Sequence, residues 1–182
     1  MDLGKRLDRP VVLVGLLGVG KSTVGRRLAK RLGLPFVDSD SEIEDAVGLP
    51  WGELFERYGE ADFRDGERRL VARLMDGEVR VLATGGGAYV DPRTRQLLNE
   101  RAITVWLDAP VDVLHERTAR RATRPLLKNG DAKRTLEELA KVERLAYAEA
   151  HIHVKSSAGA HKDVVDAIVT ALEKHLSNRG AA

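Results

Sequence analysis

The feature that most constrains this chain is a glycine-rich segment between an apolar run and an amphipathic run. Residues 15–23 read GLLGVGKST and match the pattern G-x-x-x-x-G-K-[ST] in full. The run PVVLVGL at 10–16 predicts a buried strand, and residues 20–33 predict a helix that ends at Gly33 before Pro35. A strand, a glycine-rich turn and a helix in this order favour a phosphate-binding loop over a chance glycine-rich turn.

The rest of the chain alternates in the same way, and this alternation predicts an α/β fold. Further strands are indicated at 35–40, 79–87, 103–110 and 151–156. Helices are indicated at 42–48, 51–59, 61–76, 92–101, 111–121, 132–150 and 161–176, with a loop at 122–131 and a disordered tail at 177–182. Continuous apolar strands joined by helices form a parallel sheet covered on both faces, and its ligands bind where the strands end.

Length and composition narrow the class of protein. At 182 residues the chain suits one domain with a full core. Its 30 basic and 28 acidic residues nearly cancel and aromatic residues make up 4%, so no nucleic-acid partner is expected. The absence of cysteine excludes disulfides and thiolate chemistry and fits a reducing cytoplasm. No signal peptide, membrane span or membrane partner is expected, because the apolar runs are too short.

The glycine-rich segment predicts that ATP or GTP binds. Glycines let backbone N–H groups turn inward around a phosphate, and the start of the following helix adds its positive end. Lys21 would supply a mobile cation for the β- and γ-phosphates, and the Ser22 hydroxyl is a ligand type that Mg²⁺ accepts.

Two carboxylates follow the second predicted strand. Asp38 and Asp40 alternate along a segment predicted to be extended, so both would point toward the ligand-binding edge. Asp38, nearer the sheet, is expected to hold the metal shell, and Asp40, further out, to meet the hydroxyl of an acceptor. The alternative is an Asx turn that leads into the helix at Glu42.

Glycine and arginine residues complete the predicted edge. The segment TGGGA (84–88) suits a close approach of another molecule to the main chain, although a plain flexible turn has the same composition. Arg64 lies three residues before Glu67, a spacing typical of an ion pair or of an ordinary solvated helix face. Arg124 lies in a basic loop of the kind that forms a closing lid, and Arg117 on the preceding helix faces the same region.

The helix predicted at 132–150 carries charge on its apolar side. At about 100° per residue, Glu143 falls near the middle of the apolar face and Arg144 about a quarter turn away. A fraying helix or a buried Glu–Arg pair would account for this pattern, and so would a face that borders a ligand.

These motifs together resemble the shikimate kinase family over about Arg9 to Leu176. The resemblance rests on GLLGVGKST, FVDSD, the set Phe63, Arg64 and Glu67, TGGGA and RPLL, in this order and spacing. It implies a three-layer P-loop fold like that of nucleoside-monophosphate kinases, with a five-stranded parallel sheet flanked by helices. It also implies a single kinase domain over 1–182, with acceptor-binding helices at about 41–77 and a lid at about 118–133.

The activity that the resemblance implies is ATP-dependent phosphorylation of the 3-hydroxyl of shikimate, a step of chorismate and aromatic amino-acid biosynthesis. Mg²⁺ would accompany ATP, and the protein would act as a cytoplasmic monomer. Asp40 would orient or deprotonate the acceptor hydroxyl, Arg64 would bind the shikimate carboxylate, and Asp38 would hold the metal through water. The other substrate-binding residues would be Phe55, Phe63, Gly86 and Gly87. The ATP-binding residues would be Gly18, Val19, Gly20, Lys21, Ser22 (also a metal ligand), Thr23, Arg117 and the lid residue Arg124, with Lys21 and Arg124 also catalytic.

One position departs from the family pattern. The family carries a second carboxylate-binding arginine four residues before a tyrosine, with a proline between them. Here Glu143 stands four residues before Tyr147 and Arg144 three residues before it, without a proline. Arg144 would bind the substrate only if the helix were locally over- or under-wound. Alternatively, Glu143 pairs with Arg64 or Arg144 and weakens shikimate binding or favours a less acidic acceptor. A kinase of another polyol acid such as gluconate, and a nucleotide-binding homologue with weak turnover, are the remaining alternatives.

Overall fold

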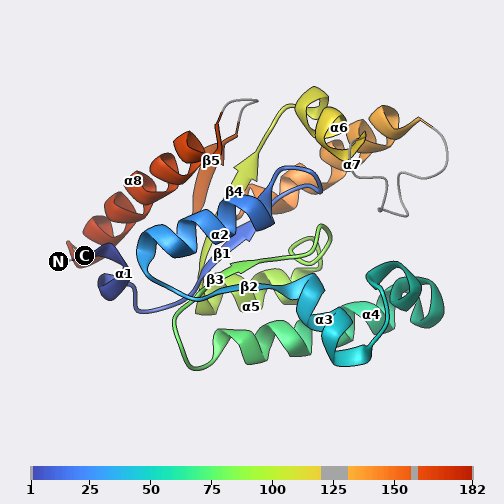
Figure 1. The fold of residues 1–182 in the computed structure, drawn as a ribbon, viewed down its shortest axis with the longest axis horizontal. Coiled ribbons are helices and arrows are strands. Elements are labelled where there is room, and N and C mark those ends of the chain that lie inside the picture. Colours follow the sequence, from blue (N-terminus) through green and yellow to red (C-terminus); the bar gives the residue numbers. More distant parts are fainter. Residues whose placement is uncertain (1, 120–130, 157–159, 182) are drawn as a thin grey trace.

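The computed structural model describes residues 2–119, 131–156 and 160–181, which form a parallel five-stranded sheet with helices on both sides (Figure 1). The strands are ordered β2-β3-β1-β4-β5. Their bounds are β1 Val11–Val14, β2 Phe36–Asp38, β3 Val81–Ala83, β4 Ile103–Asp108 and β5 Ile152–Lys155. The helices are α1 Leu3–Arg6, α2 Lys21–Leu32, α3 Ser39–Val47, α4 Trp51–Met75, α5 Pro92–Arg101, α6 Val111–Ala119, α7 Ala132–Tyr147 and α8 His161–Gly180. The predicted α/β fold with five parallel strands is confirmed.

The direction of the chain between strands decides which face each helix covers. From β1 the chain runs to the edge strand β2, and from there it returns across the sheet to β3, β4 and β5. Because crossovers between parallel strands are right-handed, these opposite directions place α2 on one face and α4 and α5 on the other. The packing agrees, since α2 contacts α8, β1 and β3, whereas α5 contacts α4 and β4 (Figure 1).

The central strands are buried by this double cover. The side chains of residues 11–14 in β1 are fully buried, as are Val81 and Leu82 in β3. The edge strand β5 alternates instead, with Ile152 and Val154 buried and the residue after each of them exposed. This difference explains why the central strands read as continuous apolar runs in the sequence.

The register of the strands brings their carboxyl ends to one line. Ala83 at the end of β3 lies opposite Leu13 of β1 on one side and opposite Asp38 of β2 on the other. Trp106 in β4 lies opposite Val14 at the end of β1. The segments that follow β1, β2 and β3 therefore start beside one another, and these segments carry most of the predicted site residues.

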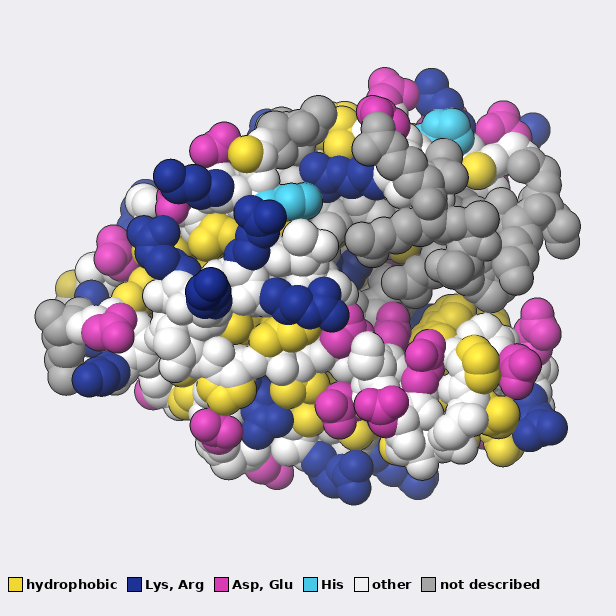
Figure 2. Space-filling view, in the orientation of Figure 1, with side chains coloured by type: hydrophobic (Ala, Val, Ile, Leu, Met, Phe, Trp, Pro, Cys, Tyr) yellow, Lys and Arg dark blue, Asp and Glu magenta, His cyan; other side chains and the backbone are white. Residues whose placement is uncertain are grey.

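Charges of both signs cover the face drawn in Figure 2, in separate patches. Basic side chains gather over α2, and acidic ones gather around α3 and α4 (Figure 2). The exposed basic residues of α2 are Arg26, Arg27, Lys30 and Arg31. The basic patch thus lies on the helix that begins at the phosphate-binding motif, where a positive potential favours anions.

Two expectations about helix ends need correction. Residues 177–182 are predicted to be a disordered tail, but α8 continues to Gly180, so this prediction is wrong for residues 177–180, and Ala182 lies outside the described residues. The Ser177 hydroxyl donates to the carbonyl oxygen of Glu173 at 2.9 Å, and Arg179 lies 3.4 Å from Asp8 near the other end of the chain (Figure 1). The helix predicted at 132–150 ends earlier, at Tyr147 in α7.

The break predicted between the helices at 51–59 and 61–76 is confirmed, because α4 kinks at Gly59, where φ is 76° and the backbone is not helical. The short helix α1 is not indicated by the sequence pattern, and the loop predicted at 122–131 lies outside the described residues except for Asp131, which caps α7. Within the described ranges, no helix combines the length and the apolar character needed to cross a bilayer.

Two helical glycines provide a matched test of the packing between α2 and the sheet. A Cβ added to Gly25 in α2 would lie 2.5 Å from Cε2 of Phe36 in β2, whereas a Cβ added to Gly66 in α4 meets no atom within 4 Å. We expect Gly25→Ala to lower the free energy of unfolding by about 1–3 kcal/mol through overpacking. Gly66→Ala should raise it by up to about 1 kcal/mol, because alanine favours the helix. Urea denaturation measures both, and a stabilising effect of Gly25→Ala would contradict the packing argument.

Candidate active site

The glycine-rich loop after β1 wraps around the side chain of Lys21. Gly15, Gly18 and Gly20 have φ angles of 145°, 82° and 99°, a region that glycine adopts far more readily than other residues. Lys21 begins α2 and is buried, and its Nζ donates to the carbonyl oxygens of Gly15 at 2.6 Å and Leu16 at 3.0 Å. The loop therefore forms a cradle with a cation inside, which is the arrangement that binds phosphate groups.

Ser22 and Asp38 meet beside this loop. The Ser22 hydroxyl donates to Oδ2 of Asp38, while Oδ1 of Asp38 accepts from the backbone N–H groups of Asp40 at 3.0 Å and Ser41 at 3.3 Å. Asp38 thus caps α3 with one oxygen and contacts Ser22 with the other. The extended conformation predicted through Asp40 is wrong, because the alternative Asx turn forms and Asp40 lies in the first turn of α3.

The loop after β3 packs directly on two of the predicted acceptor-binding residues. A Cβ added to Gly85 would collide with Oδ1 of Asp40, and one added to Gly87 would collide with Nη2 of Arg64. The N–H group of Gly85 also donates to the Ser39 hydroxyl at 3.1 Å. The absence of side chains at these glycines therefore lets Asp40 and Arg64 pack directly on the backbone of the loop, as a bound molecule also could.

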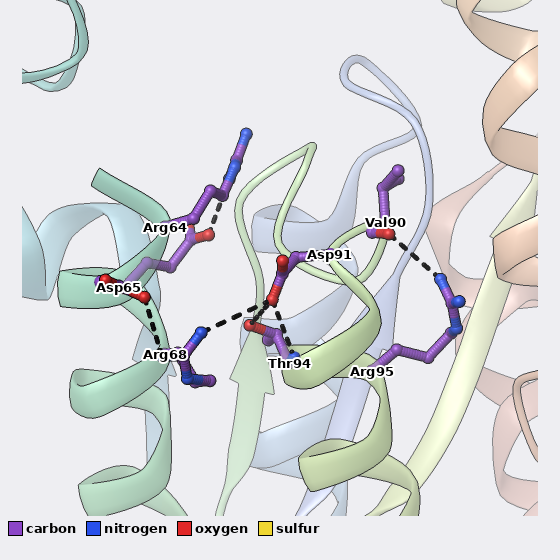
Figure 3. Close-up of polar contacts among 8 residues, drawn as sticks. Arg64, Asp65, Arg68, Val90, Asp91, Thr94 and Arg95 are labelled. Carbon is purple, nitrogen blue, oxygen red and sulfur yellow. Dashed lines mark hydrogen bonds and ion pairs between the residues drawn. The ribbon is translucent and has the colours of Figure 1, made fainter. Parts of the chain in front are cut away.

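Arg64 is held by a buried carboxylate on the same helix. Its Nη1 donates to Oε1 of Glu67 at 2.6 Å, and the exposed fractions of the two side chains are 15% and 0%. Burial raises the pKa of Glu67 to about 7, although Arg64 acts in the opposite direction. Figure 3 shows Arg64 extending from α4 toward the loop after β3, whereas Arg68 turns toward Asp91. The ion pair expected from the spacing is confirmed, and it sets the direction of the Arg64 guanidinium.

Two predicted aromatic residues lie behind Arg64 in a cluster with Trp51. The ring centroid of Trp51 lies 5.3 Å from that of Phe55 and 5.2 Å from that of Phe63, and the centroids of Phe55 and Phe63 are 5.7 Å apart. The guanidinium carbon of Arg64 lies 5.3 Å from the centroid of the Phe63 ring, which is within the range of a cation–π contact. The cluster therefore forms an apolar wall on which the cation rests.

Arg117 approaches the phosphate loop from α6. Its Nη1 donates to the carbonyl oxygen of Val19 at 2.8 Å, which ties the loop to this helix. A Cβ added to Gly20 would lie 3.6 Å from Arg117 and 3.6 Å from His161, so both side chains lie beside the loop. The predicted lid residue Arg124 lies outside the described residues.

On α7, Arg144 is held by Asp108 at the end of β4. Its Nη2 donates to both carboxylate oxygens of Asp108, each at 2.8 Å, and the Arg144 side chain is 53% exposed. The helix runs without interruption over Ala132–Tyr147, so no local change of winding brings Arg144 inward. Among the described residues, no ion pair joins Glu143 to Arg64 or to Arg144.

Glu143 instead borders a polar cavity of about 700 Å³ together with Arg64 and Gly87. Its Oε2 lies 2.8 Å from the hydroxyl oxygen of Tyr147, and that hydroxyl lies 2.7 Å from the carbonyl oxygen of Gly86. Burial raises the pKa of Glu143. The rest of the cavity is lined by α4 and by the segment that leads into α5, namely Glu60, Ala61, Asp65, Arg68, Val90, Asp91 and Arg93. Its size and polar lining suit a small, hydrophilic acceptor.

Two residues hold the glycine loop although the sequence pattern gives them no such part. Neither Ser39 nor Tyr147 is among the site residues predicted from the sequence. In the structure, Ser39 accepts from Gly85 and Tyr147 contacts Gly86. A tyrosine on a buried face is a weak sequence signal for such a contact, because a buried phenol needs a hydrogen-bond partner.

The phosphate-loop end of the site also fits a magnesium ion bound together with a nucleotide. Ser22 and Asp38 offer only oxygen ligands and lie in contact with each other, which suits Mg²⁺. The described part of the chain contains no group of three or more His, Cys, Asp or Glu residues able to hold a metal ion. Mg²⁺ is commonly held by one or two protein groups, substrate phosphates and water, and these two residues match that pattern.

Comparisons with known proteins agree with this geometry. A family profile described as shikimate kinase matches residues 17–173. A shikimate kinase of Caulobacter vibrioides is 51% identical over 173 residues, which cover 95% of this chain and 86% of the relative. One of Novosphingobium aromaticivorans is 50% identical over 178 residues, which cover 96% and 92%. The structure of shikimate kinase from Acinetobacter baumannii in complex with shikimate matches with a TM-score of 0.86 at 40% identity, covering 93% of this chain and 94% of that one. The chain therefore belongs to the shikimate kinase family.

Proposed function

We propose that this chain transfers the γ-phosphoryl group of ATP to the 3-hydroxyl of shikimate, giving ADP and shikimate 3-phosphate, within chorismate and aromatic amino-acid biosynthesis. The observation that carries the proposal is the packing of Asp40 and Arg64 on the glycine loop, at the sheet edge that also holds the phosphate loop. An acid for a hydroxyl and a cation for a carboxylate thus lie beside the phosphate-binding cradle. Phosphoryl transfer needs such positioning and charge neutralisation more than it needs covalent chemistry.

On the nucleotide side, Lys21 and the backbone of Gly18, Val19, Gly20, Ser22 and Thr23 would hold the phosphates. Lys21 is already inside the loop, and Arg117 is bonded to the carbonyl oxygen of Val19. Ser22 would hold Mg²⁺ directly and Asp38 through water, and the bound ion would neutralise charge on the phosphates. Arg117 would lie against the adenine, and Arg124 would reach the phosphates when a lid over about 118–133 closes, a segment only partly described.

On the acceptor side, Asp40 would orient or deprotonate the 3-hydroxyl, and Arg64 would bind the carboxylate of shikimate. The backbone of Gly86 and Gly87 would contact the ring substituents. Phe55 and Phe63 would support the pocket wall, and the helices at about 41–77 would make up the acceptor-binding part of a single kinase domain. Because Arg144 is engaged by Asp108, we assign no substrate contact to it, and Arg64 is the proposed carboxylate clamp.

The position of Glu143 at the cavity favours a second candidate acceptor, a polyol acid such as gluconate. A homologue that binds nucleotide but turns over poorly is the third possibility, and the intact set of Lys21, Ser22, Asp38 and Asp40 argues against it. We further propose that the protein acts as a cytoplasmic monomer with small-molecule partners only. Its lack of cysteine fits a reducing compartment.

A coupled assay of ADP release tests the proposed function. We expect ADP release with ATP, Mg²⁺ and shikimate together, and none above background when gluconate replaces shikimate. Release with gluconate alone would favour the second acceptor class. Binding of ATP without release in the presence of either acceptor would contradict both kinase activities.

Asp40→Asn tests the role of the acid beside the acceptor. The amide keeps the shape of the side chain but cannot accept the proton, so we expect kcat to fall by about 10²–10⁴-fold. The affinity for ATP should remain within a factor of about 2–3, because Asp40 is not placed on the nucleotide side. Asp45→Asn, at an exposed position of the same helix, is the matched control and should leave kcat unchanged. A kcat for Asp40→Asn equal to that of the control would contradict the assignment.

Arg64→Lys tests the carboxylate clamp while keeping a positive charge beside Glu67. Lysine lacks the planar fork that binds a carboxylate with two parallel hydrogen bonds. We therefore expect the KM for shikimate to rise by about 10–100-fold, the equivalent of one charge-assisted hydrogen bond, with a smaller change in kcat. Steady-state kinetics measure this, and Arg69→Lys, on the exposed side of the same helix, serves as control. Equal KM values for shikimate in Arg64→Lys and Arg69→Lys would contradict the assignment of Arg64 to the acceptor carboxylate.

A further inference from the structure

The hydroxyl of Tyr147 lies within hydrogen-bond distance of two oxygen atoms, one of the backbone and one of a carboxyl group. It lies 2.7 Å from the carbonyl oxygen of Gly86 and 2.8 Å from Oε2 of Glu143. Tyr147 is 1% exposed, and its ring packs against the rings of Tyr89 and Trp106. Water therefore has little access to this group, and the hydrogen bonds around it must be satisfied by protein atoms.

A count of protons decides how these three oxygens can be arranged. A phenol carries one proton and a backbone carbonyl carries none. If Glu143 were ionised, one of the two short contacts would bring together oxygen atoms with no hydrogen between them. If Glu143 carries a proton, it donates to the oxygen of Tyr147, and Tyr147 donates to the carbonyl oxygen of Gly86. Only this second arrangement satisfies both contacts.

The surroundings of Glu143 support the protonated form. Burial of the carboxyl group raises the pKa of Glu143, against the opposing effects of the Tyr147 hydrogen bond, Lys21 and Arg64. Burial and the neighbouring carboxyl group also raise the pKa of Tyr147, so the phenol keeps its proton. The other charged groups around the same cavity come from α4 and the start of α5, and they are Glu60, Asp65, Arg68, Asp91 and Arg93. Together with Arg64 they are three cations and three anions, so the charged lining has no net positive charge that would favour an ionised Glu143.

We propose that Glu143 acts as an uncharged carboxylic acid in the acceptor-bound protein and determines which acceptors bind. Through Tyr147 it positions Gly86 of the glycine loop, and its second oxygen, on the cavity that Arg64 also lines, accepts a hydrogen bond from an acceptor hydroxyl. The cavity then offers a guanidinium for one carboxylate and a neutral oxygen for a hydroxyl group. The substrate class is a polyhydroxylated monocarboxylate, and the inference rests on the proposed function for its acceptor.

This arrangement predicts how acceptor binding depends on pH. An ionised Glu143 would repel the acceptor carboxylate and could not donate to Tyr147. The acceptor-bound state therefore has the higher Glu143 pKa, so binding takes up a proton once the pH exceeds the pKa of the unliganded protein. Affinity is fully present below that pKa and is lost as the pH rises through it.

Glu143→Gln is the central variant, because its amide group donates to Tyr147 and its carbonyl oxygen faces the cavity as the protonated acid would. Calorimetric titration with shikimate, from about pH 5.5 to about pH 8.5 in two buffers of different ionisation enthalpy, gives both Kd and the number of protons taken up. We expect wild type and Glu143→Gln to have the same Kd at the lowest pH. Where Glu143 loses its proton within this range, wild type should weaken by up to about tenfold per pH unit relative to the variant and take up as much as one more proton.

Glu143→Ala completes the series, since it removes the hydrogen bonds without adding charge. We expect it to weaken shikimate binding by about 3–10-fold at the lowest pH. Agreement of wild type with Glu143→Gln at every pH, together with weaker binding by Glu143→Ala, would also support the proposal, because the acid then keeps its proton throughout. Tighter binding by Glu143→Gln, tenfold or more at every pH, would overturn it by showing a charged Glu143. Equal binding by Glu143→Ala and wild type would overturn the contact with the acceptor.

A measurement without acceptor separates this proposal from the proposed function. If wild type does not bind shikimate at all, the proposed function fails, and the protonation of Glu143 can still be followed. The side-chain carboxyl ¹³C resonance of Glu143, assigned by its loss in Glu143→Gln, should titrate above the ordinary glutamate pKa of about 4.3. Titration at or below that value would overturn the proton arrangement. Thermal unfolding of each variant confirms that it is folded before these comparisons are made.

Discussion

The pairing of β3 between β1 and β2 is the constraint on which the site depends. Ala83 lies opposite both Leu13 and Asp38, so the three segments that follow these strands leave the sheet at the same level. A shift of β2 by a single residue would move Asp38 away from Ser22. A shift of β3 by a single residue would turn the side chains of β3 to the other face of the sheet. Residues 11–14 and 81–83 are buried at this register, and a longer shift would draw polar flanking residues such as Arg80 into the interior, which is costly.

The glycine loop after β3 converts that register into a binding surface. Its glycines are costly in backbone entropy, and the contacts explain why they are needed. Gly85 lies against Asp40 and Gly87 lies against Arg64, so any side chain at these positions would push the acid and the cation away from the main chain. The loop is in turn held from outside, by Ser39 on one side and by Tyr147 on the other. Rigid support of this kind is what a site that works by positioning requires.

Much of the fold and the phosphate loop could be predicted from the sequence, because both depend on local patterns. Continuous apolar runs indicate buried parallel strands, and a glycine-rich turn between strand and helix is a local feature. Asp40 was harder to place, because the chain after a strand can either stay extended or turn into a helix. Asp38 ends β2 opposite Ala83 and also caps α3, so the extended segment stops there and Asp40 lies in the first turn of the helix. The parts played by Ser39 and Tyr147 could not be predicted, because their partners on the glycine loop lie 46 and 61 residues away in the chain. The sequence pattern also does not indicate that α8 continues to Gly180, where Arg179 lies 3.4 Å from Asp8 near the start of the chain.

Glu143 and Arg144 point in different directions and have different partners because of helix geometry and the groups that surround α7. Neighbours on a helix point about 100° apart, so the two side chains cannot both enter one cavity. Asp108 at the end of β4 lies where Arg144 points, and two contacts at 2.8 Å hold the guanidinium there, beside the ring of Trp106. Glu143 is then left on the inner side, where ionisation is disfavoured by burial and its contact is with Tyr147. An inward acid on this helix is therefore compatible with a binding site for an anion when the acid is protonated. A protonated Glu143 carries no negative charge, so the positive charge of Arg64 stays available for the carboxylate of the bound molecule.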